Sequence, residues 1–157
     1  MDVRVSTRGA EKFDRLAGRF DRAAAELSYR LEDATRGEGD AAVAAVRAAW
    51  LGVEVTSTRG GGSSSGLRAR VAAATSADPV PGGVRVRVDA GQVDSVYGGS
   101  LTRGLNGMGR WRHPVFGNAN AWTQQAGQEV FYSTLRGRAW EPPLERVVDE
   151  TAREIEG

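Results

Sequence analysis

Apolar residues recur every three or four positions along the first third of the chain. The pattern picks out Phe13, Leu16, Phe20, Ala24, Leu27 and Leu31, and it resumes at Val43, Val46 and Trp50. Such spacing places one apolar stripe on a helix. Gly37 and Gly39 interrupt it, and each weakens a helix by about 1 kcal/mol relative to alanine. Since no proline lies in this region, we expect one long helix of roughly 40 residues with a bend at the glycines, rather than two helices.

A second pattern alternates apolar residues with other types. Val3 and Val5 predict a short strand before the helix, with Thr7 as its N-cap. Leu67–Val71 and Val84–Val88 alternate with arginine, and the segment 78–83 between them is typical of a hairpin connection. If these two strands pair, one sheet face is aliphatic and packs on the long helix. The other face then carries Arg68, Arg70, Arg85 and Arg87. That face would line a channel, meet an acidic neighbour, contact a phosphate backbone, or simply be solvated.

The rest of the chain is predicted more coarsely. Residues 89–110 are glycine-rich, with one short helical turn near residues 92–96, and residues 121–125 are expected to form a strand. Phe131 and Tyr132 lead into a helical region, where Pro142 and Pro143 suit the first turn of a helix. The expected inner face of that helix is Leu144, Val147, Val148, Thr151 and Ile155. The pattern therefore predicts an α+β fold in one domain, residues 1–157, with a small antiparallel sheet packed on one long N-terminal helix and a C-terminal helix.

A Gly/Ser-rich segment separates the long helix from the predicted sheet. It spans about residues 52–66 and contains the run Gly60-Gly61-Gly62-Ser63-Ser64-Ser65-Gly66, so we expect a flexible loop. The segment lacks the Gly-Lys-Ser/Thr ending of a phosphate-binding loop and does not indicate a nucleotide site.

Composition and charge narrow the classes of function. Only 40% of the 157 residues are apolar, which suggests that neighbouring subunits contribute part of the ordering. The net charge is +1, but residues 51–113 hold eight arginines against four acids, and residues 114–157 hold four against seven. A basic middle and an acidic tail either dock between copies or are ordinary surfaces. Cysteine is absent, which excludes disulfides, and no membrane span or signal peptide is expected.

The most unusual segment is Arg110-Trp111-Arg112-His113-Pro114-Val115-Phe116-Gly117-Asn118. It contains the only histidine, so it is either a reactive site or a rigid docking loop. Zinc usually takes several His and Cys ligands, and general acid–base chemistry on His113 needs a positioned carboxylate. Asp94 and Glu129, the nearest acidic residues, are far away in sequence, so we favour the docking loop. Its expected members are Trp111, Arg112, His113, Pro114, Phe116, Gly117, Asn118 and Trp122. We expect no catalytic residue, metal ligand or cofactor.

The order of predicted elements, taken with particular residues, resembles a known family. The residues are Gly66-Leu67-Arg68, Arg112-His113-Pro114-Val115-Phe116-Gly117-Asn118, Trp122-Thr123-Gln124-Gln125 and Phe131-Tyr132. They resemble the tail-completion (head–tail joining, or neck) proteins of tailed bacteriophages with long non-contractile tails, in the form found in phages or prophages of high-GC actinobacteria.

The resemblance implies a structural virion protein of the neck, without enzymatic activity, that is assembled in the bacterial cytoplasm. It implies a homo-oligomeric ring between the connector or stopper of the capsid and the terminator or tail-tube proteins, with non-specific DNA contact in the channel and no membrane partner. A tail terminator or another minor connector ring protein is the nearest alternative. A basic DNA-binding module, and a small metal-dependent nuclease using His113 with Asn118 and Asn120, are alternatives of other classes.

Overall fold

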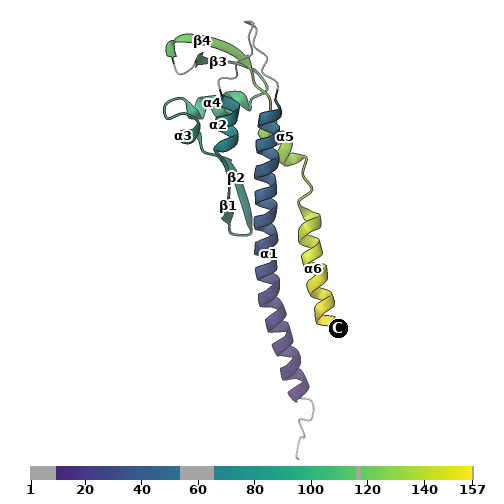
Figure 1. Ribbon diagram of the computed structural model, residues 1–157. Coiled ribbons are helices and arrows are strands. Elements are labelled where there is room, and N and C mark those ends of the chain that lie inside the picture. Colours follow the sequence, from purple (N-terminus) through teal and green to yellow (C-terminus); the bar gives the residue numbers. More distant parts are fainter. Residues whose placement is uncertain (1–9, 54–65, 116–117, 157) are drawn as a thin grey trace, which may run out of the picture. The chain divides into compact units, whose positions relative to one another are not determined.

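The computed structural model describes residues 10–53, 66–115 and 118–156. Its helices are α1 (Ala10–Gly52), α2 (Leu67–Ala73), α3 (Ala90–Val93), α4 (Gly98–Leu105), α5 (Val130–Arg136) and α6 (Glu141–Glu156). Its strands are β1 (Thr75–Val80), β2 (Gly83–Val88), β3 (Arg110–Val115) and β4 (Asn118–Ala126), as Figure 1 shows. This mixture of helices and antiparallel strands confirms the α+β prediction. The strand expected at residues 3–6, its neighbour Thr7 and most of the Gly/Ser loop lie outside the described residues.

The chain divides into two compact units. One comprises Met1–Arg36 with Trp140–Gly157, and the other comprises Gly37–Ala139. The boundary falls within α1, so this helix contributes residues to both units. The expectation of one domain over residues 1–157 stays a prediction.

α1 is a single helix of 43 residues, which confirms the long N-terminal helix. Gly39 is buried in it, and an added Cβ there would lie 2.6 Å from Cγ2 of Val84 and 3.3 Å from Cβ of Ala77. Gly37 has no atom within 4 Å of such a Cβ. The glycine at position 39 therefore permits the β1–β2 hairpin to lie against α1, with Val84 of the predicted strand Val84–Val88 at the contact.

The β1–β2 hairpin closes through the sequence Val80-Pro81-Gly82-Gly83, with Val80 opposite Gly83 in the register. Gly82 has a φ of 74°, which is the left-handed conformation that the third position of a type II turn requires, and proline is favoured just before it. Pro79 lies within β1, where it is tolerated because each strand of this two-stranded sheet is an edge strand.

The strand predicted at Leu67–Val71 is wrong, because these residues begin helix α2. Leu67 and Val71 are four residues apart, and both are buried on one side of that helix. The partner of β2 is instead β1, a segment that was predicted in part as a hairpin connection. The single sheet is also wrong, since β1–β2 and β3–β4 form two separate two-stranded sheets.

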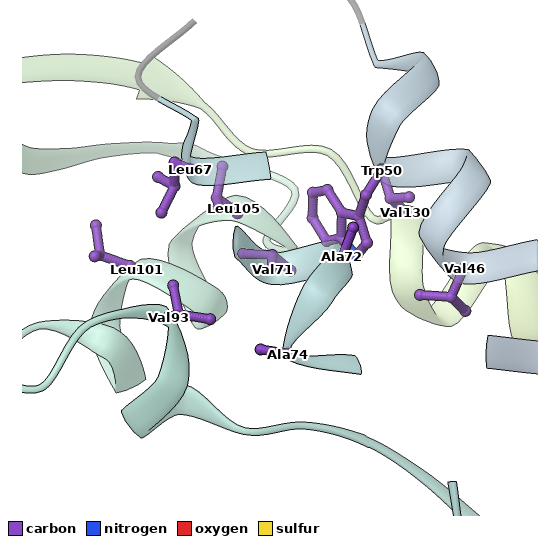
Figure 2. Packing of buried hydrophobic residues seen from close by; sticks show 10 residues of the cluster. All are labelled: Val46, Trp50, Leu67, Val71, Ala72, Ala74, Val93, Leu101, Leu105 and Val130. Carbon is purple, nitrogen blue, oxygen red and sulfur yellow. The ribbon is translucent and has the colours of Figure 1, made fainter. Parts of the chain in front are cut away.

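The core of the Gly37–Ala139 unit is built mainly from helices. Trp50 of α1 is only 2% exposed, and it belongs to one buried cluster with side chains from α2 to α5. Figure 2 shows these residues, which are Val46, Trp50, Leu67, Val71, Ala72, Ala74, Val93, Leu101, Leu105 and Val130. Half-buried Trp111 of β3 and Phe131 of α5 pack against the same cluster. The second hairpin is thus anchored to the core through its first strand.

In the other unit, the first part of α1 is linked to α6 by polar contacts. Arg30 forms ion pairs with Glu26 at 2.6 Å and with Glu154 at 3.0 Å. Arg19 donates a hydrogen bond of 2.8 Å to the carbonyl oxygen of Ile155, in the last turn of α6. Thr151 is buried at 3% exposure. Val148, which was predicted for the inner face, is 46% exposed. None of the helices in the described ranges combines the length and apolar character that crossing a membrane requires.

Candidate docking surface

The segment singled out by the sequence forms β3 and the start of β4. As predicted from Pro114, His113 lies on extended backbone, and β3 pairs with β4 in antiparallel fashion. Trp111 lies opposite Gln125, Arg112 opposite Gln124, and His113 opposite Thr123, with a register shift between Pro114 and Val115. Because successive side chains of a strand point to opposite faces, the register divides the predicted docking residues into two groups.

The first group, Trp111 and His113, faces the body of its unit. The two rings lie 4.6 Å apart between centroids at an angle of 31°, and both side chains are half-buried. A Cβ on Gly104 of α4 would lie 2.2 Å from Cδ2 of the Trp111 ring. Because Gly104 has no side chain, the Trp111 ring packs directly on α4 at this position. This contact holds the β3–β4 hairpin against α4.

Both ring nitrogens of His113 have partners inside the hairpin. Nδ1 lies 3.0 Å from the carbonyl oxygen of Pro114, and Nε2 lies 3.1 Å from Oε1 of Gln125. No carboxylate of the described residues is hydrogen-bonded to this ring. These two contacts fix the orientation of the imidazole ring.

The second group lies on the opposite face of the hairpin. Trp122 is 47% exposed, and the guanidinium carbon of Arg112 lies 6.0 Å from the centre of its ring. Arg110 and Gln124, which share this face, are exposed as well. Trp122 is thus separated from Trp111 and His113, whereas the sequence had grouped the three in one cluster.

The turn between the two strands is described only in part. Phe116 and Gly117, which the sequence placed in the docking loop, lie outside the described residues. Asn118 is exposed at the start of β4, and its Oδ1 accepts a hydrogen bond of 2.9 Å from the backbone N–H of Asn120. This Asx-type contact stabilises the entry of the chain into β4.

The four arginines expected on one sheet face do not share a face. Arg68 and Arg70 belong to α2, and only Arg85 and Arg87 lie on β2, where both are exposed. Arg87 forms an ion pair with Asp78 at 2.5 Å. The strict alternation predicted for Val84–Val88 is confirmed. Arg68 and Arg70 do not lie on the same sheet face as Arg85 and Arg87, contrary to the prediction.

Arg68 forms a hydrogen bond at the C-terminal end of α1. Its Nη1 donates a hydrogen bond of 2.7 Å to the carbonyl oxygen of Val53, the residue that follows α1. The last turn of α1 contains no basic residue of its own, so Arg68 supplies the positive charge that stabilises a helix C-terminus. Partial burial lowers the pKa of the Arg68 guanidinium from its usual value.

The sequence also missed two polar residues whose side chains form hydrogen bonds with the backbone of this unit. Arg47 of α1 donates hydrogen bonds to the carbonyl oxygens of Ala72, at 3.1 Å, and Thr75, at 2.8 Å. Asp94 accepts hydrogen bonds at Oδ1 from the backbone N–H groups of Val96 and Tyr97, and these bonds lower its pKa below the usual 3.8. Only the Asp-x-x pattern before a turn could have indicated Asp94, and no local signal marks Arg47.

Within residues 10–53, 66–115 and 118–156, no group of three or more His, Cys, Asp or Glu side chains is arranged to hold a metal ion. The geometry of the site is that of an exposed Arg and Trp surface on a hairpin with an anchored back face. A scan against protein-family models gives no match, and searches of curated proteins and of solved structures give none either.

Proposed function

We propose that this protein is a structural virion protein without catalytic activity. In this proposal, copies of the chain form a ring at the head–tail interface of a tailed bacteriophage and join the capsid connector or stopper to the tail terminator or tail tube. The ring is assembled in the host cytoplasm, and its channel contacts DNA only non-specifically. The His-Pro-Val-Phe-Gly-Asn and Trp-Thr-Gln-Gln segments resemble those of neck proteins, and this resemblance supports placing the proposed ring at the phage neck.

One structural observation carries the assembly part of the proposal. The apolar stripe of α1 stays uncovered over its first turns, with Phe13 73%, Leu16 42% and Phe20 50% exposed. Arg19 already bonds to the last turn of α6, so within this unit α6 does not extend along the turns of α1 that precede Arg19. Large apolar side chains gathered on one exposed face are typical of interaction sites. In the proposed assembly, a neighbouring copy of the chain covers this stripe.

Light scattering coupled to size-exclusion chromatography tests the assembly. We expect the wild-type protein to form a discrete oligomer, and Phe13→Ser/Phe20→Ser to shift it toward the monomer. Tyr29→Ser is the matched control, because Tyr29 is 71% exposed but lies away from the stripe on the same helix. Electron microscopy and mass spectrometry of purified phage particles then test the location. A chain that is absent from the particles contradicts the proposal, whatever its oligomeric state.

A tail terminator or another minor connector ring protein is the alternative within the virion, and the position of labelled protein along the particle distinguishes the two. A basic DNA-binding module is the alternative of another class. The sequence argument for this alternative placed Arg68 and Arg70 on the sheet, and both residues lie on α2 instead. The exposed pair Arg112 and Trp122 on the β3–β4 hairpin still suits contact with nucleic acid. DNA binding by the isolated monomer that weakens steeply with salt would favour this alternative.

A further inference from the structure

The outer face of the β3–β4 hairpin carries unpaired positive charge beside an aromatic ring. Arg110, Arg112 and Trp122 make up this basic hairpin face, and all three side chains are exposed. Neither arginine forms an ion pair with a carboxylate of the described residues, although the Arg112 guanidinium lies 6.0 Å from the Trp122 ring centre. Arginine and tryptophan are the residues most enriched at the energetic centres of protein interfaces.

The outer face of α6 carries the complementary charge. Glu141, Glu145 and Asp149 recur every four residues and are exposed, and Val148 beside them is 46% exposed. We call these four residues the acidic helix ridge. The three carboxylates have no ion-pair partner within the described part of the chain, unlike Glu154, which is bound to Arg30. Asp149 and Glu145 lie about 160° and about 120° around the helix from buried Thr151, whereas Glu141 and Val148 lie nearer to that buried side.

The spacing of charges on the two surfaces agrees. Arg110 and Arg112 are two residues apart on an antiparallel strand, which separates them by about 6.8 Å along the strand. Successive carboxylates of the ridge are four residues apart on a helix, which separates them by about 6 Å along its axis. Two arginines of a strand laid along the ridge can therefore each meet a carboxylate. Trp122, on the neighbouring strand beside Arg112, then has Val148 as an apolar partner.

We propose that the basic hairpin face of one copy binds the acidic helix ridge of a second copy. This inference rests on the proposed function, which requires copies to associate, and it names the surfaces that meet. The two surfaces differ, so the contact is heterologous and leaves one surface of each kind open for the next copy. Repetition of such a contact closes a ring when the rotation between copies permits it. The complementary partner is present on the same chain at matching spacing, which favours a second copy over a nucleic acid.

The test uses two charge-reversed versions of the full chain. The first version carries Arg110→Glu and Arg112→Glu, and the second carries Glu145→Arg and Asp149→Arg. Each version alone opposes like charges across the contact, so we expect its self-association to weaken by about a hundredfold or more. An equimolar mixture restores both contacts in alternation, because the acidic hairpin meets the basic ridge and the acidic ridge meets the basic hairpin. Sedimentation velocity over a series of concentrations measures all three samples.

Arg85→Glu on β2 and Glu150→Arg on another side of α6 are controls, since both residues are exposed and belong to neither surface. We expect both control variants to associate like the wild type. Wild-type association of the first version alone, or a mixture that stays monomeric, would overturn the inference while the proposed assembly stands. A wild-type protein that stays monomeric would overturn both. Monomeric wild type that binds duplex DNA through Arg110 and Arg112 would assign the face to nucleic acid instead.

Discussion

Gly104 and Trp111 are in such close contact that a methyl group on the glycine would have no room. Its Cβ would lie 2.2 Å from Cδ2 and 2.3 Å from Cε3 of the indole ring. A real contact at this distance does not occur, so the hairpin or α4 would have to shift. The anchoring of the docking hairpin thus depends on one glycine of a helix that the sequence pattern did not predict.

We therefore expect Gly104→Ala to destabilise the protein by about 1–3 kcal/mol, because the displaced ring leaves its rotamer and its contacts. Gly99→Ala in the same helix is the control, since nothing lies within 4 Å of its Cβ. That control should be neutral or stabilising by up to about 1 kcal/mol, as alanine is the better helix former. Urea unfolding followed by circular dichroism measures both free energies. Equal effects of the two substitutions would contradict the close contact.

The two tryptophans of the hairpin should differ in their contribution to stability. Trp111→Ala should cost about 3 kcal/mol, because this ring packs against the core and α4. Trp122→Ala should cost about 1 kcal/mol, because nearly half of its surface is exposed in the monomer. The same unfolding experiment measures both changes. If Trp122→Ala proved the more costly, the separation of the two rings onto opposite faces would be wrong.

Loss of Arg68 should weaken the end of α1. Arg68→Ala removes the hydrogen bond to the Val53 carbonyl oxygen and the charge near the helix terminus, at a cost of about 1–2 kcal/mol. Arg70→Ala on the same short helix should change stability by no more than about 0.5 kcal/mol, because Arg70 is exposed. Hydrogen exchange of the last turn of α1 should accelerate in the Arg68 variant alone.

Asp94 should make stability depend on pH in the acid range. Its folded pKa is lowered by the backbone N–H groups of Tyr97 and Val96, so its contribution is present above the usual value of 3.8 and is lost as the pH falls through the folded pKa. Asp94→Ala should lower stability near neutral pH by about 0.5–2 kcal/mol, as for a lost helix cap. Asp94→Asn retains an acceptor oxygen, so it should lose less and should flatten the pH dependence below about pH 4. An unchanged acid slope in Asp94→Asn would contradict the assignment.

The regular elements of the fold were predictable where a long or strict pattern existed. The stripe from Phe13 to Leu31 and its continuation to Trp50 gave α1, and the alternation of Val84–Val88 gave β2. The same alternation over Leu67–Val71 was misleading, because a segment of five residues satisfies the helix and strand periods together. The segment Leu67–Val71 is helical because Leu67 and Val71, four residues apart, are then both buried in the cluster that contains Trp50.

The sequence predicted the local backbone of the site, but it did not predict which side chains share a face of the hairpin. Pro114 correctly indicated the extended backbone at His113, but the division of Trp111 from Trp122 depends on the register between β3 and β4. The roles of Gly104 and Arg68 depend on partners that the fold brings near, Trp111 and Val53, and no spacing in the sequence reports such contacts.

Native mass spectrometry of the wild-type protein is the sharpest test of whether copies of this chain form a ring. We expect one dominant closed oligomer whose mass is an integral multiple of the subunit mass and which electron microscopy shows as a ring. A chain that remains monomeric at every concentration, or that does not occur in purified particles, would contradict the proposed ring.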